Sequence, residues 1–334
     1  MNQISVLLGA GFSRNWGGFL GLEVFEYLLG CPDINADTYL RELVWRNREE
    51  GFEVALGELQ ENFKRDRQKF AEPLRKLQSA IVGMFKNMNS AFEGQRFDFG
   101  SDIPTSITYF LTQFDAIFTL NQDLLLESHY TKCNFSNGRD YRRWLGQEAP
   151  GLEPAPGSAE QDYRKLFRNA WQPVEQSEFQ VRSGTQPIYK LHGSSNWIER
   201  DGADLLVMGG GKKEIIAQHP ILTWYAEQFS RSLCDYNTRL MVIGYGFRDH
   251  HINKVIAQAV YEYGLKLFVI DQPKGSDVAC VFRSAVHPGA TLTAFGYDLE
   301  EAFSQGLVGA SRRSLGEIFG RDSIEHAKIM RFFE

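Results

Sequence analysis

The 334-residue sequence is poor in cysteine and contains no long apolar run. Its four cysteines lie far apart and form no C-x-x-C pair. The spacing of a zinc ribbon is therefore absent, and we expect reduced thiols in a cytoplasmic protein. No apolar stretch approaches the roughly 18 residues that a membrane-spanning helix needs, so we expect no membrane association. The first predicted strand begins at residue 4 without a positively charged segment before it, which leaves no room for a signal peptide.

The sequence also lacks an excess of positive charge. It has 36 lysines and arginines against 42 aspartates and glutamates, a net charge of −6. Proteins that bind nucleic acid directly usually carry a basic surface, so this balance argues against such binding. The G-x-S-x-G motif, the Walker A lysine and the kinase motifs are absent as well.

One tripeptide, Asp249-His250-His251, suggests a metal site because it resembles the motif of the DHH phosphoesterases. A metal pair of that kind needs several further aspartate or histidine ligands, and no Asp-rich cluster follows the other predicted strands. The tripeptide follows a glycine loop, where Asp249 suits the N-cap of a helix. We therefore expect no metal cofactor.

What the sequence does contain is a series of short apolar runs typical of buried strands. Hydrophobic residues make up 43% of the chain, which is ample for a large core. Most of the runs alternate with helical patterns, which predicts a Rossmann-like α/β fold: a mostly parallel sheet flanked by helices on both faces. The predicted strands are residues 4–8, 116–120, 188–191, 239–243, 266–270 and 291–295, with a weaker one at 205–208.

Two insertions and a tail interrupt this pattern. Residues from about 38 to 114 are helical in character with mixed-charge faces, which favours a solvated helical insertion over a binding surface. Residues 146–161 are rich in proline and glycine, which predicts a mobile loop. We expect one Rossmann-like domain over residues 1–300 that contains both insertions, followed by a helical tail over residues 301–334.

The first predicted strand runs directly into Gly9-Ala10-Gly11. A glycine turn at this place lets the backbone approach a pyrophosphate. The dinucleotide fingerprint G-x-G-x-x-G requires a third glycine at position 14, where this chain has Arg14. This departure argues against a nicotinamide dehydrogenase and leaves open how a dinucleotide would be used.

Glycines and polar residues follow the other predicted strands too. Ligands of open α/β sheets bind beyond the carboxyl ends of the strands, so we expect these residues to converge on one crevice. Singly, Asn121 and Asp123 could cap a helix and His192 could be a core histidine, but together the residues favour a site. The set is Ser13, Asn121, Gln122, Asp123, His192, Gly193, Gly244, Tyr245, Gly246, Phe247 and Asp271.

Four motifs in this order, "GAGFS", "TLNQD", "LHG" and "GYGF", resemble the sirtuin superfamily. The resemblance extends from residue 4 to about residue 271, and "VIGYGFRDHHIN" is similar to a form found in divergent sirtuin-like proteins of bacteria. The G-I-P-x-F-R sequence and the zinc-binding cysteine pairs of the protein deacylases are missing. The resemblance therefore implies a Rossmann-like domain without a zinc-ribbon module, similar to the NAD hydrolases of prokaryotic antiviral immunity.

In such a hydrolase NAD+ is the substrate, and the resemblance implies a role for each motif. Asn121 would orient the ribose and the attacking water, and Asp123 would hold the nicotinamide carboxamide. His192, with an ordinary pKa near ~6.5, suits a general base at neutral pH. The implied contacts to NAD+ are Gly9, Ala10, Gly11, Ser13 and Arg14 around the diphosphate and Gly244, Tyr245, Gly246, Phe247 and Asp271 on the adenosine side.

We therefore expect an NAD+ glycohydrolase that releases nicotinamide and ADP-ribose and depletes NAD+ during infection. The resemblance further implies control by assembly, through a homo-oligomer or through a separately encoded activator or sensor. Such a partner would be an ATPase, a nucleotide-processing enzyme or an Argonaute-like protein. A module that senses NAD+ or ADP-ribose would use the same glycine loops but would not need both Asn121 and His192. An NAD-dependent protein deacylase is the third alternative.

Overall fold

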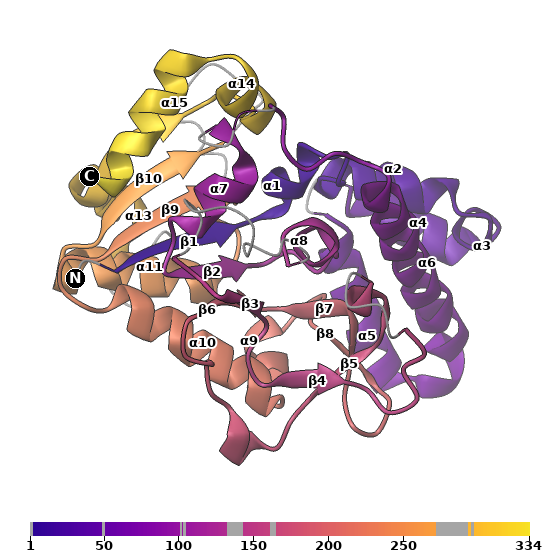
Figure 1. Cartoon of the computed structure of the whole chain (residues 1–334). Helices are drawn as coiled ribbons and strands as arrows, with labels where there is room; N and C mark the ends of the chain where they lie inside the picture. The colour runs from indigo at the N-terminus through magenta and orange to yellow at the C-terminus, as the bar shows by residue number, and fades with distance from the viewer. Residues whose placement is uncertain are drawn as a thin grey trace.

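The computed structural model describes residues 3–48, 51–100, 102, 105–131, 143–160, 165–271, 293–294 and 297–334. Its centre is a seven-stranded sheet in which every neighbouring pair of strands runs parallel (Figure 1). This sheet confirms the predicted Rossmann-like α/β fold. In spatial order its strands are β13 (Leu307–Ser311), β10 (Lys266–Ile270), β9 (Arg239–Ile243), β1 (Ile4–Leu8), β2 (Ala116–Thr119), β6 (Thr185–Lys190) and β3 (Gly146–Glu148).

The strand order reverses at β1. On one side β1 pairs with β2 and the sheet continues outward to β6 and β3, whereas on its other side β1 pairs with β9 and the sheet continues to β10 and β13. The loops that leave β1 and β9 therefore diverge from each other at their carboxyl ends. A reversal of this kind creates the crevice in which open α/β sheets bind their ligands.

Helices cover both faces of this sheet. Along β1, Val6 and Leu8 belong to one hydrophobic core and Leu7 belongs to another, because successive side chains of a strand point to opposite faces. The first core includes residues of α7 (Ile107–Thr112), α8 (Leu125–His129), α14 (Leu315–Gly320) and α15 (Ser323–Met330). The second includes residues of α10 (Pro220–Leu233), α11 (His250–Tyr263) and α13 (Leu299–Gly306).

A further group of helices lies beyond the carboxyl ends of the strands, at the indigo and purple side of Figure 1. In its longest helix, α6, the buried residues Leu77, Ile81 and Met84 recur every three to four positions and form one apolar stripe. The group therefore packs through its own interior as well as against the sheet domain. Its members are α2 (Gly21–Gly30), α3 (Pro32–Asn35), α4 (Thr38–Arg46), α5 (Phe52–Arg65) and α6 (Arg67–Glu93), and we call them the helical group.

Several short strands lie outside the main sheet or outside the predicted positions. A four-stranded sheet contains β4 (Leu152–Pro154), β5 (Trp171–Pro173), β7 (Gly193–Ile198) and β8 (Asp204–Leu206). Two strands, β3 and β4, lie within residues 146–161, the range predicted to form a mobile loop. The strand β8 overlaps the weaker predicted strand at 205–208. Within residues 291–295 the structure describes β11 (Thr293–Ala294), which pairs antiparallel with β12 (Tyr297–Asp298) instead of joining the main sheet. One of the two edge strands of the main sheet, β13, lies in the range expected to form a helical tail.

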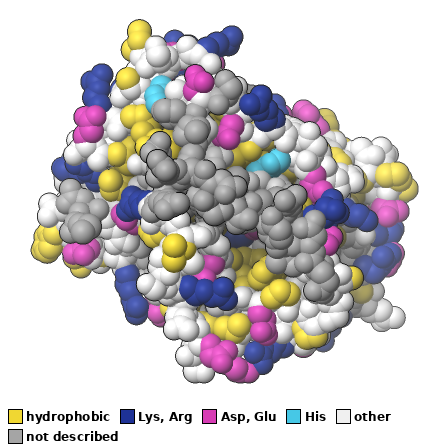
Figure 2. Space-filling model, in the orientation of Figure 1, with side chains coloured by type: hydrophobic (Ala, Val, Ile, Leu, Met, Phe, Trp, Pro, Cys, Tyr) yellow, Lys and Arg dark blue, Asp and Glu magenta, His cyan; other side chains and the backbone are white. Residues whose placement is uncertain are grey.

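The described surface carries charges of both signs. On the face shown in Figure 2, lysine and arginine side chains are interspersed with aspartate and glutamate side chains. This mixture agrees with the net charge of −6. Among the helices that the structure describes, none combines the length and the hydropathy needed to cross a membrane.

Candidate active site

The carboxyl ends of the parallel strands open into a large cleft. Its walls come from the ends of β1, β2, β6, β9 and β10, from α9 (Lys212–Ile216) with the loop before it, and from α5 of the helical group. The cleft has a volume of about 3460 Å³, several times the roughly 300–1,000 Å³ of pockets that enclose small ligands. The space between the sheet and the helical group therefore admits a dinucleotide and leaves room beside it.

Two glycine loops interlock at the base of the cleft, where the strand order reverses. The N–H groups of Gly9 and Gly11 donate to the carbonyl oxygens of Ile243 and Gly244, both at 2.9 Å. A Cβ atom at Gly11 would lie 2.7 Å from Gly244 Cα, and Gly244 has φ +64°. Glycine is required for this contact, and these two N–H groups bind the neighbouring loop.

Asn121 fastens the first glycine loop to the end of β2. Its side-chain N–H group donates to the carbonyl oxygen of Gly9 at 2.9 Å and to Ser13 Oγ at 3.0 Å. Ser13 is buried in α1 (Ala10–Arg14) and does not line the cleft. The serine therefore supports the loop from behind and is not placed against a ligand in the cleft.

Gln122 and Asp123 follow Asn121, and their side chains point in different directions. Asp123 is buried, and its Oδ1 accepts a hydrogen bond from the backbone N–H of Leu125, the first residue of α8, at 3.0 Å. Gln122 lines the cleft, and its Nε2 donates to the carbonyl oxygen of Val207 at 2.6 Å. At this strand end the glutamine, and not the aspartate, faces the cleft.

The second glycine loop is held by its aromatic side chains. Tyr245 and Phe247 are buried, and Phe247 has φ +52°, which is uncommon for a residue with a side chain. The Tyr245 hydroxyl donates to Asn253 Oδ1 at 2.9 Å and accepts from the backbone N–H of Asp249 at 3.0 Å. These contacts fix the loop against α11 and leave the exposed Gly246 as its tip in the cleft.

Most of the predicted site residues meet in the cleft. Arg14 lies at its edge, where its guanidinium forms a 2.7 Å ion pair with Glu23 of α2. Ser13, Asp123 and Gly193 do not line the cleft. The predicted residues that do line it are Gly9, Ala10, Gly11, Arg14, Asn121, Gln122, His192, Gly244, Tyr245, Gly246, Phe247 and Asp271.

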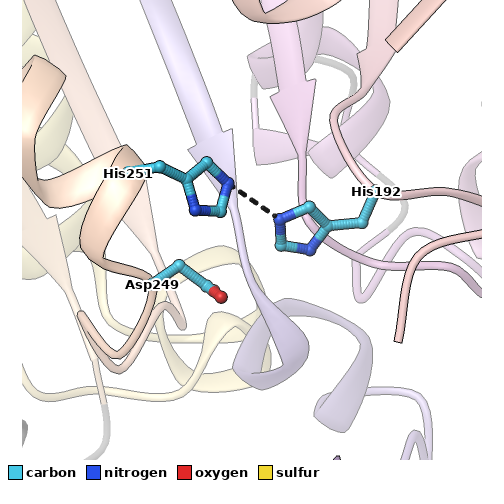
Figure 3. Close-up of side chains that lie close together, drawn as sticks. All are labelled: His192, Asp249 and His251. Atoms are coloured by element: carbon cyan, nitrogen blue, oxygen red, sulfur yellow. Dashed lines mark hydrogen bonds between the residues drawn. The ribbon is translucent and has the colours of Figure 1, made fainter. Parts of the chain in front are cut away.

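His192 follows β6 and is almost completely buried, with 2% of its surface exposed. Its Nε2 lies 3.3 Å from Nε2 of His251, which comes from the first turn of α11 (Figure 3). Burial, reinforced by the positive charge of Lys212, lowers the pKa of His192 from 6.5 to about 3. The imidazole is therefore neutral at every physiological pH, and its pKa does not lie near the value expected from the sequence.

An ion-pair bridge lies next to the two histidines. Lys212 Nζ lies 2.8 Å from Asp249 Oδ1 and 2.7 Å from Glu53 Oε2 of α5. Asp249 precedes α11 as expected, but its side chain makes no capping hydrogen bond and binds the lysine instead. Burial alone would raise the pKa of Asp249, but the nearby positive charges outweigh burial and lower it.

Sequence patterns did not identify this group as part of the site. His251, Lys212 and Glu53 lie in three separate elements, and none follows a strand of the main sheet directly. For Lys212 the sequence signal is the preceding run Gly209-Gly210-Gly211, since consecutive glycines mark a loop, and Asp249 and His251 belong to the tripeptide that suggested a metal site.

His192, Asp249 and His251 also have the composition of a metal site. Their ligand atoms all lie within 4.8 Å of one another, and imidazole together with carboxylate binds zinc, iron and other transition metals. The ammonium group of Lys212 already supplies the positive charge that Asp249 needs. The histidine pair and the Lys212–Asp249 ion pair therefore hold these side chains together, and a metal ion would have to compete with the lysine for Asp249.

Acidification is expected to destabilise the fold through His192. The unfolded imidazole has a pKa near 6.5 and the folded one about 3, so between these values the unfolded state binds more protons. The free energy of unfolding is therefore at its full value above pH 6.5 and falls as the pH drops towards 3. At pH 5 the loss from this one group is about 2 kcal/mol.

Urea unfolding of the wild type and of His192→Asn at pH 7.5 and pH 5 measures how much unfolding free energy is lost through His192 on acidification. We expect the wild type to lose about 2 kcal/mol more than the variant on acidification. All other titrating groups are common to both proteins, so equal losses would show that His192 is not buried as a neutral imidazole.

A parallel sheet whose strand order reverses between two interlocked glycine loops is typical of nucleotide-binding α/β proteins. The model of the SIR2-like domain family matches residues 115–285, more than half of the 334 residues. The chain therefore belongs to the SIR2-like family. SIR2-like domains are typically NAD-dependent enzymes, so membership implies an NAD-related activity with NAD+ as substrate.

The matched range agrees with the site geometry. It includes Asn121, His192 and the second glycine loop, whereas Gly9 to Arg14 lie outside it and reach the same cleft through the pairing of β1 with β2 and β9. A comparison with curated protein sequences gives no match.

Proposed function

We propose that the chain is an NAD+ glycohydrolase that cleaves NAD+ to nicotinamide and ADP-ribose. The observation that carries this proposal is that Asn121 and His192 both line the cleft beside the interlocked glycine loops. The two residues follow neighbouring strands, β2 and β6, whose parallel pairing places their carboxyl ends side by side. A polar amide and a neutral imidazole are thus available where a dinucleotide would lie.

The chemistry of the reaction requires both groups. Cleavage of the nicotinamide–ribose bond generates positive charge at the anomeric carbon, as in glycoside hydrolysis. A neutral imidazole is the protonation state in which His192 can accept a proton from a ribose hydroxyl or from water. One ring nitrogen of His192 faces His251, so we assign Nδ1 to the substrate.

Asn121 has a second function besides fastening the glycine loop. Its Nδ2 is already bound to Gly9 and Ser13, whereas its carboxamide oxygen has no hydrogen bond within the described part of the chain. In our proposal this oxygen accepts a hydrogen bond from the attacking water or a ribose hydroxyl. Asp123 is directed away from the cleft, so we propose Gln122 for the polar contact to the nicotinamide carboxamide in its place.

The predicted deacylase alternative is favoured by one observation, the volume of the cleft, which exceeds the space that NAD+ needs. A second substrate could enter between α5 and the sheet. We prefer hydrolysis because the zinc-binding cysteine pairs of the deacylases are absent from the sequence. On the same resemblance we propose a cytoplasmic role in prokaryotic antiviral immunity, with activity controlled by self-assembly or by a separately encoded activator.

The direct test is to incubate the purified chain with NAD+ and to separate nicotinamide and ADP-ribose by chromatography. The assay is run alone, at increasing protein concentration, and with the products of neighbouring genes as activators. We expect nicotinamide and ADP-ribose in equal amounts without any added peptide. Nicotinamide release that requires an acyl-lysine peptide would establish a deacylase instead. Saturable NAD+ binding without turnover under all three conditions would establish a sensor.

A further inference from the structure

The bridge formed by Lys212 joins the helical group to the centre of the cleft. Glu53 belongs to the first turn of α5, and Asp249 immediately precedes α11, so the two carboxylates come from opposite sides of the cleft. Lys212 Nζ lies within 2.8 Å of both. The lysine side chain is only 15% exposed, so the two contacts replace most of the water that would otherwise surround the ammonium group. We call this the Lys212 bridge.

The backbone beside the bridge packs tightly against the same helix. A Cβ atom at Gly57 of α5 would lie 2.6 Å from the backbone nitrogen of Gly210. Gly209 has φ +88°, and a Cβ atom there would lie 2.6 Å from Gln60 Oε1. Since α5 rests directly on the loop that leads into Lys212, α5 cannot shift without moving this loop or breaking the bridge.

The other end of the bridge lies at the histidine pair. The ligand atoms of Asp249, His251 and His192 lie within 4.8 Å of one another (Figure 3). The two Nε2 atoms are 3.3 Å apart, and such a contact requires one ring nitrogen to donate and the other to accept. The carboxylate of Asp249 attracts the proton of this pair, and the ammonium of Lys212 repels it. The position of Lys212 therefore affects the orientation and tautomer of both imidazoles.

We propose that the Lys212 bridge makes the orientation of His192 depend on the position of α5, with Asp249 and His251 as the positioning residues between them. The effect on catalysis rests on the proposed function, because it requires His192 to act on NAD+. An activator or a second copy of the chain that displaces α5 would then switch the site without touching NAD+. Glu53 is the outermost residue of this connection and acts only through the lysine.

The test uses the full chain labelled with ¹⁵N in its histidine rings. The ring signals are assigned by their loss in His192→Asn and His251→Asn. We expect Glu53→Gln to shift the signals of His192, although Glu53 does not contact that residue, and Lys212→Met to shift them further. Lys212→Arg keeps both ion pairs and should retain the wild-type signals. The matched control is Glu72→Gln, which breaks an exposed 2.7 Å ion pair with Arg75 on α6.

Catalysis gives a second and separate readout. In an active preparation Glu53→Gln should lower kcat for nicotinamide release by roughly 10- to 100-fold at unchanged KM, because a misplaced catalytic group costs about that much. Glu72→Gln should leave both constants unchanged. Thermal unfolding confirms that each variant is folded. If kcat is unaffected while NAD+ is hydrolysed, the proposal is wrong.

The spectra distinguish failure of this proposal from failure of the proposed function. Shifted His192 signals in Glu53→Gln without NAD+ hydrolysis by the wild type would support the coupling and contradict the glycohydrolase. Histidine spectra that are identical in Glu53→Gln, Lys212→Met and the wild type would overturn the coupling. A saturable 1:1 change on addition of Zn²⁺ at micromolar concentration would also overturn it, because the cluster would then be a metal site.

Discussion

Nicotinamide release is expected to fall by roughly 100- to 10,000-fold when His192 is replaced by alanine, which is the range for loss of a positioned general base. The imidazole is buried at the end of β6 and is neutral, which is the protonation state that accepts a proton, although its lowered pKa makes it a weaker base than an exposed histidine. Water that enters the space left by the side chain is a far weaker base at neutral pH. The loss should therefore appear in kcat, with a smaller change in KM for NAD+.

The matched control is His219→Ala. His219 precedes α10, outside the cleft, and its Nδ1 pairs with Glu199 at 2.6 Å. This variant loses the same imidazole but should retain wild-type kcat and KM. Initial rates of nicotinamide release, measured on variants with wild-type thermal unfolding, provide the comparison. Hydrolysis by His192→Ala within about threefold of the wild type would remove the histidine from the mechanism.

The largest expected loss of stability follows the replacement of Gly244 by alanine. A Cβ atom there would lie 2.3 Å from the backbone nitrogen of Phe12 and 2.4 Å from the carbonyl carbon of Gly11. Gly244 also has φ +64°, a conformation that costs other residues roughly 1–2 kcal/mol. With the overpacking term of about 1–3 kcal/mol, the free energy of unfolding should fall by about 3 kcal/mol.

Gly246→Ala, two residues further along the same loop, provides the control. A Cβ atom at Gly246 meets no other atom within 4 Å, so we expect a change of at most about 0.5 kcal/mol. Urea unfolding of the two variants and the wild type measures the difference. If Gly244→Ala unfolds at the same urea concentration as Gly246→Ala, the glycine loops do not interlock as described.

The sequence predicts the sheet wherever a strand is buried on both faces. The ranges Ile4–Leu8, Arg239–Ile243 and Lys266–Ile270 are rich in apolar residues, and each forms an interior strand of the sheet. The sequence does not predict the edge strand at Leu307–Ser311, β13, because this range contains glycine, alanine and serine, and its strand conformation depends on pairing with β10. The predicted strand at 291–295 has the right composition, but the described part of it pairs only with β12.

The candidate site could be predicted where a residue directly follows a strand of the main sheet. Asn121 and His192 do so, and parallel pairing alone brings them to one edge. Strand position does not decide which way the following side chains turn: Gln122 lines the cleft and Asp123 does not. The role of Lys212 could not be predicted from the sequence, because its partners Glu53 and Asp249 lie 159 and 37 residues away along the chain. These contacts depend on how α5 packs.

The interlocked glycine loops also determine which parts of the fold can form first during synthesis. The loop that begins at Gly9 is synthesised before Ile243 and Gly244, to which two of its hydrogen bonds go. A ribosome must therefore add more than 200 further residues before the first loop acquires its partner. Until then β1 has β2 as its only neighbour in the main sheet. A nascent chain that ends before Ile243 therefore lacks both partners of the first glycine loop and has no assembled cleft.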